Sequence, residues 1–80
     1  MKFEWRKTNI DLDEETLYIN DKSMTSYFMR NDYRKSEHYL MTFHLPGIEN
    51  FEIKHKSDID KSKKKAEREI ENWFQEMTKD

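Results

Sequence analysis

The chain has 80 residues, of which 34% are apolar and 40% charged, so it has room for one small hydrophobic core. It contains no cysteine, which excludes disulfides and thiolate metal sites. No run of residues is apolar for long enough to predict a signal peptide or a membrane span. We therefore expect one cytoplasmic domain over residues 1–80, without membrane contact.

The charges are unevenly distributed, although the formal net charge is only −2. Five acids and no base lie between Asn9 and Asp21, whereas seven bases and three acids lie between Lys54 and Arg68. Such a separation can steer a charged partner toward one pole of the molecule, but runs of like charge are also typical of ordinary solvated surface.

Alternation of apolar and polar residues predicts the first three strands. Phe3 and Trp5 share one face of a strand over Lys2–Thr8. An acidic, turn-rich stretch leads to a short strand over residues 16–20 and then to an aromatic strand over residues 25–30.

The clearest strand, residues 38–45, follows a polar connection that we place at residues 31–36. Its predicted core face consists of alternate apolar residues, Tyr39, Met41, Phe43 and Leu45. Pro46 and Gly47 form the pair favoured at the centre of a type II turn, which predicts a hairpin with a returning strand over Phe51–Lys54.

The hydrophobic period then changes to about 3.6 residues, which predicts one long helix over about residues 59–78. Ser57 or Asp58 is the expected N-cap, and Lys63 is expected to pair with Glu67 one turn later. The apolar stripe of the helix consists of Ile59, Ala66, Ile70, Trp73 and Met77.

A sheet with one apolar face and a helix with one apolar stripe are each incomplete alone. We therefore expect an α+β fold in which an antiparallel sheet of three to five strands packs against one long C-terminal amphipathic helix.

No catalytic, cofactor-binding or metal-binding residue is predicted. His38 and His44 would lie roughly 20 Å apart along one strand, too far to share an ion. The acidic run Asp11–Glu15 lacks the glycine and the terminal glutamate of a calcium loop, so we interpret it as solvated. Nucleophile elbows, glycine-rich phosphate loops and paired-histidine helices are absent from the sequence, so we expect no enzyme and no cofactor.

The adjacent aromatics Trp73 and Phe74 cannot both point straight into one core. With Tyr18, Phe28 and Tyr33, which fall in the opposite register, they suggest an exposed patch that binds a partner. A second small cluster under a loop is an equal alternative.

Bases at the start of the helix suggest another site, because free N–H groups and the helix dipole favour phosphate there. The competing interpretation is that these are the solvated bases of an ordinary helix surface. The candidate nucleic-acid contacts are Lys54, Lys56, Lys61, Lys63, Lys64, Lys65 and Arg68.

The run Phe51-Glu52-Ile53-Lys54, followed by a helix with Lys63-Lys64-Lys65-Ala66-Glu67, resembles the strand-then-helix ending of many small phage and mobile-element proteins. It is also similar to the last helix of double-stranded RNA-binding domains and of the arm-binding domains of phage integrases. That resemblance implies phosphate contacts at Lys63, Lys64 and Lys65. The chain departs from these two families because it has no predicted N-terminal helix and no strongly basic sheet.

Together these observations predict a non-enzymatic protein-binding module, such as a phage or mobile-element factor that inhibits or modulates a host protein, for instance a defence-system component. A small nucleic-acid-binding domain that uses the Lys54–Arg68 patch is the alternative. A homodimer, formed through the sheet or the Trp73–Phe74 edge, also remains open.

Overall fold

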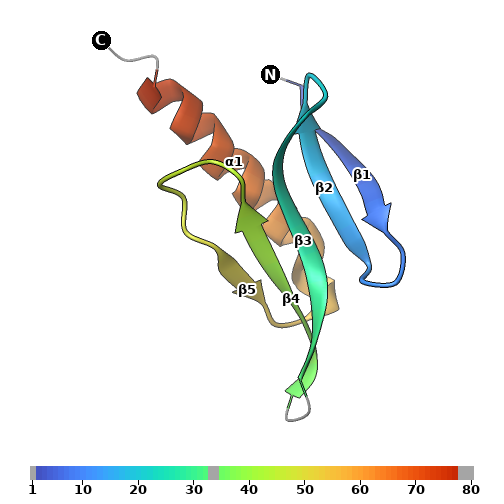
Figure 1. The fold of residues 1–80 in the computed structure, drawn as a ribbon. Helices are drawn as coiled ribbons and strands as arrows, with labels where there is room; N and C mark the ends of the chain where they lie inside the picture. Colours follow the sequence, from blue (N-terminus) through green and yellow to red (C-terminus); the bar gives the residue numbers. More distant parts are fainter. Residues whose placement is uncertain (1, 33–34, 78–80) are drawn as a thin grey trace.

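The fold is seen in a computed structural model that describes residues 2–32 and 35–77. Five strands form one antiparallel sheet in chain order, and a single helix crosses one of its faces (Figure 1), which confirms the expected α+β class. The elements are β1 (Glu4–Asn9), β2 (Glu14–Ile19), β3 (Lys22–Asp32), β4 (Lys35–Phe43), β5 (Phe51–Ile53), a short 3₁₀ turn η1 (Lys56–Asp58) and α1 (Ile59–Met77).

Turn residues determine where the chain reverses direction between neighbouring strands of the meander. Asn20 and Asp21 join β2 to β3 with φ of 52° and 65°, the left-handed pair of a two-residue type I′ hairpin turn. Gly47 has a φ of 84°, as the second central position of the predicted type II turn requires. The chain then returns as β5, which pairs with β4 from Tyr39↔Ile53 to Met41↔Phe51.

The polar connection expected over residues 31–36 is wrong at residues 31–32 and 35–36, which belong to strands, whereas residues 33–34 lie outside the described part of the chain. β3 continues to Asp32 and β4 begins at Lys35, and these two residues are the last pair of the β3–β4 ladder. The polar composition misled the prediction, because hairpin pairing satisfies backbone N–H and C=O groups even where the side chains are hydrophilic.

The core lies between α1 and one sheet face. Tyr39 and Met41 are buried on the predicted face of β4, and Ala66 and Ile70 are fully buried on α1. Burying a large apolar side chain such as Met41 or Ile70 stabilises a fold by about 1.5–3 kcal/mol. The core consists of two clusters, one of Tyr27, Tyr39, Met41, Ile53, Ile59 and Ala66, and one of Leu17, Ile19, Met24 and Ile70.

Three details of α1 differ from expectation. Ser57 and Asp58 lie inside η1, which runs directly into the helix, so neither takes the extended N-cap position. Met77 is 65% exposed, so the apolar stripe stops contributing to the core before the helix ends. In place of the expected Lys63–Glu67 pair, Lys63 donates to Glu15 of β2, and Glu67 accepts a hydrogen bond from the indole N–H of Trp5 in β1.

Within residues 2–32 and 35–77, no helix combines the length and the apolar composition that crossing a membrane would require.

Candidate partner-binding groove

A groove of about 690 Å³ lies between β5 and the first turns of α1. Two carboxylates, those of Glu52 and Asp58, line it. Five side chains with a positive charge also line it, those of Lys54, Lys61, Lys64, Lys65 and Arg68. The groove is therefore positive in a chain whose formal net charge is −2.

The helical repeat places most of these bases. Lys61, Lys65 and Arg68 follow one another at spacings of four and three residues, which puts their side chains on one side of α1. Ala66 and Ile70 bind α1 to the sheet with no exposed surface, so the rotation of the helix about its axis is set by the core. The bases consequently turn toward β5.

One base also contacts β5 directly. The Nζ of Lys65 lies 4.3 Å from the centre of the Phe51 ring, a cation–π distance. Phe51 in turn packs against Phe43 of β4, with ring centres 6.0 Å apart. A smaller hollow of about 310 Å³ next to the loop of residues 47–50 shares Phe51 and Lys65 with the groove. The two hollows therefore meet at Phe51, where β5 begins.

The structure brings together five of the seven bases that the sequence suggested as phosphate contacts. Lys56 lies in η1 and does not line the groove. Lys63 lies on another side of α1, where its Nζ donates to Oε2 of Glu15 at 2.9 Å. This bond also joins the basic segment to the acidic one, so the two charged segments of the sequence are neighbours in space.

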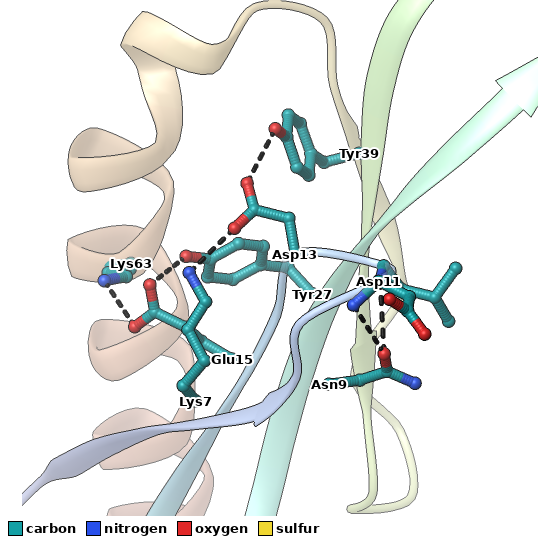
Figure 2. A network of polar contacts seen from close by, with 9 residues as sticks. Lys7, Asn9, Asp11, Asp13, Glu15, Tyr27, Tyr39 and Lys63 are labelled. Carbon is teal, nitrogen blue, oxygen red and sulfur yellow. Dashed lines mark hydrogen bonds and ion pairs between the residues drawn. The ribbon is translucent and has the colours of Figure 1, made fainter.

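Figure 2 shows how the acidic segment is held against the sheet and α1. Asp13 pairs with Nζ of Lys7 at 2.8 Å and accepts a hydrogen bond from the Tyr39 hydroxyl at 3.0 Å. Glu15 accepts a bond from the Tyr27 hydroxyl at 2.6 Å, besides that from Lys63. Both carboxylates are therefore satisfied by residues of this chain.

These bonds move the pKa values away from neutral pH. The bond from Lys7, followed by that from Tyr39, lowers the pKa of Asp13. Burial acts to raise the pKa of Glu15, but the bonds from Tyr27 and Lys63 outweigh it, so the net shift is downward. In the described parts of the chain, no three histidine, aspartate or glutamate side chains are arranged to hold a metal ion.

Two residues of the proposed aromatic patch lie on the sheet face opposite to α1. Tyr18 and Phe28 alternate with residues that face the helix, and the guanidinium of Arg6 covers the Tyr18 ring at 4.5 Å. Tyr33, which the sequence also suggested, lies outside the described residues.

The other two aromatics belong to the helix side of the molecule. Trp73 donates its indole N–H to the carbonyl of Pro46 at 2.8 Å and meets Phe74 edge-on, with ring centres 5.1 Å apart. Phe74 packs against the second core cluster. The four described aromatics therefore lie on opposite sides of the sheet and do not form one patch.

Sequence reasoning assigned no site to His55 or to the free edge of β5. His55 is the second residue after β5 and lines the groove with it. The available signal was topological, because the last strand of a meander lies at the edge of the sheet unless a later strand covers it.

Comparison with protein-family models, with curated proteins and with solved structures found no match.

Proposed function

We propose that this chain is a non-enzymatic protein-binding module that receives an acidic part of its partner in the groove between β5 and α1. The observation that carries the proposal is the convergence of five bases on one groove. Complementary charge at such a surface selects partners and speeds their encounter.

A non-catalytic role agrees with the titratable groups beside the core. A general acid or base works best with a pKa near the operating pH. Here the pKa values of Asp13 and Glu15 are lowered, and those of Lys7 and Tyr27 are raised. Each group is thereby held in one protonation state at neutral pH, which suits a structural role.

The partner in this proposal is a host protein, and the chain is a phage or mobile-element factor that acts on it in the cytoplasm, for instance by inhibiting a defence-system component. The support for this origin is the small, cysteine-free, lysine-rich composition and the strand-then-helix ending. The groove supports only the acidic character of the partner.

Nucleic acid is the second candidate, and it is favoured by Lys61, Lys64 and Arg68 on the first turns of α1. Phosphate neutralisation would make the affinity fall steeply with salt, because counterions are released. An acidic protein segment also loses affinity in salt, but it remains a ligand after nuclease treatment.

The test is capture from nuclease-treated bacterial lysate with three immobilised proteins: the wild type, the double variant Lys61→Glu/Lys64→Glu and the matched control Lys2→Glu/Lys22→Glu. The control changes the net charge equally at exposed positions outside the groove. We expect an acidic protein that the wild type and the control retain and the groove variant loses. Retention by all three proteins, or loss from all three on nuclease treatment, would contradict the proposal.

A further inference from the structure

We infer that the acidic partner binds as an extended strand added to the outer edge of β5. This inference rests on the proposed function and specifies its geometry. In the described sheet, β5 is the last strand and pairs only with β4. All three of its residues, Phe51, Glu52 and Ile53, line the groove. An edge strand presents backbone N–H and C=O groups that an incoming strand can pair with.

The spacing of the bases suits an extended chain. Along α1, Lys61 and Lys65 are about 6 Å apart at 1.5 Å per residue. Side chains on one face of a strand repeat at about 6.6 Å. A segment with an acidic residue at every second position would therefore bring its carboxylates to successive bases while its backbone pairs with β5.

Charge at the groove selects against a second copy of this chain. Two β5 edges brought together would juxtapose the same bases, and like charges on an edge prevent such pairing. The acidic segment of a second copy is not available for this edge, because the carboxylates of Asp13 and Glu15 are already bonded to Lys7 and Lys63. An acidic segment of a different protein fits the groove better.

The groove suits a polypeptide better than single-stranded nucleic acid. Strand addition uses both donors and acceptors of the β5 backbone, whereas phosphate offers only acceptors. Nucleic acid also needs aromatic rings on which bases stack. Two aromatic rings line the groove in the described residues, Phe51 and His55. Lys65 already lies over Phe51, which leaves only the His55 imidazole for a base to stack on.

The test uses fluorescence anisotropy with the labelled peptide Thr-Glu-Val-Glu-Val-Glu-Thr and the full chain. Two further peptides carry N-methyl groups, one on both valines and one on the second and third glutamates. Alternate N–H groups of a strand point to opposite edges, so only one of these peptides loses its bonds to β5. We expect that peptide to bind at least about tenfold more weakly than the parent, the loss expected for one or two backbone hydrogen bonds, and the other to bind within about twofold.

Equal binding of the parent and both methylated peptides would overturn strand addition while leaving the charged groove, and with it the proposed function, intact. If the sign-reversed peptide Thr-Lys-Val-Lys-Val-Lys-Thr bound as tightly as the parent, this would overturn the proposal that the partner segment is acidic. Tighter binding of a single-stranded oligonucleotide of equal charge, lost in the Lys61→Glu/Lys64→Glu variant, would replace this inference with the nucleic-acid alternative.

Discussion

Lys63 of α1 and Glu15 of β2 form the ion pair that joins the helix to the sheet on the side away from β5, with Nζ and Oε2 2.9 Å apart. Both side chains are only 21% exposed. The Nζ of Lys63 also lies 5.4 Å from the centre of the Trp5 ring. Lys63 therefore stabilises the packing of α1 on the sheet, whereas the adjacent Lys64 and Lys65 line the groove.

Replacing Lys63 should therefore destabilise the fold, whereas replacing Lys64 should not. We expect Lys63→Gln to lower the free energy of unfolding by about 1 kcal/mol, because Glu15 loses its charged partner and the pair is partly shielded from water. Lys64→Gln, at an exposed position, should change it by less than about 0.5 kcal/mol. Urea denaturation measures both values, and equal midpoints would show that the ion pair contributes nothing.

Acid should destabilise the protein through Asp13 and Glu15. Their pKa values are lower in the folded chain than the ordinary 3.8 and 4.5. The unfolded chain therefore binds protons at a higher pH than the folded one, so this stabilisation is present above about pH 4.5 and disappears as the pH falls through the folded values. The melting temperature should accordingly drop over that acidic range.

The variant Asp13→Asn tests the assignment. Asp13 has a φ of 49°, and asparagine is among the residues that tolerate this left-handed conformation. We expect the variant to start less stable at neutral pH and to lose less stability in acid than the wild type. If the melting temperatures of the wild type and the variant fell by the same amount between pH 7 and about pH 3, this would contradict the role given to Asp13.

Alanine substitutions along the apolar stripe of α1 should differ sharply in their effect on stability between Ile70 and Met77. Ile70→Ala should lower the free energy of unfolding by about 2–5 kcal/mol, because Ile70 is fully buried in the cluster that contains Leu17, and its truncation leaves a cavity. Met77→Ala should change the free energy of unfolding by less than about 0.5 kcal/mol, because Met77 is 65% exposed. Chemical denaturation measures both changes, and similar losses of stability in the two variants would contradict this prediction.

Substitutions at Gly47 should change the stability of the fold only through the backbone conformation of this residue. With a φ of 84°, the position is strained for other residues, yet a Cβ there would meet nothing within 4 Å. We expect Gly47→Ala to destabilise by about 1 kcal/mol and Gly47→Asn by less, because asparagine accepts positive φ more readily. An alanine variant as stable as the wild type in thermal denaturation would argue against this turn geometry.

The sequence predicted those parts of the fold that depend on local periodicity. Alternation identified Tyr39 and Met41 as core residues of β4, and the helical repeat identified Ala66 and Ile70. The same reasoning extended the apolar stripe to Met77, because a repeat in the sequence does not reveal where the sheet beneath a helix ends.

The site could be predicted only in part. Four of the five bases of the groove lie between Lys61 and Arg68, so their grouping was visible in the sequence, but the orientation of Lys63 away from them was not. Its partner Glu15 is 48 residues away, and only the meander brings β2 beneath α1. Likewise, the β5 wall of the groove depends on the order of strands in the sheet, which local patterns do not contain.

The most direct test of the groove as the binding site is a titration of the isotopically labelled protein with the acidic peptide, followed by two-dimensional NMR of the backbone amides. We expect the largest shifts at Phe51–His55 and at Lys61–Arg68, and we expect them to vanish in the Lys61→Glu/Lys64→Glu variant. Shifts centred on Tyr18 and Phe28 of the opposite sheet face, or no shifts with peptide in excess, would contradict this expectation.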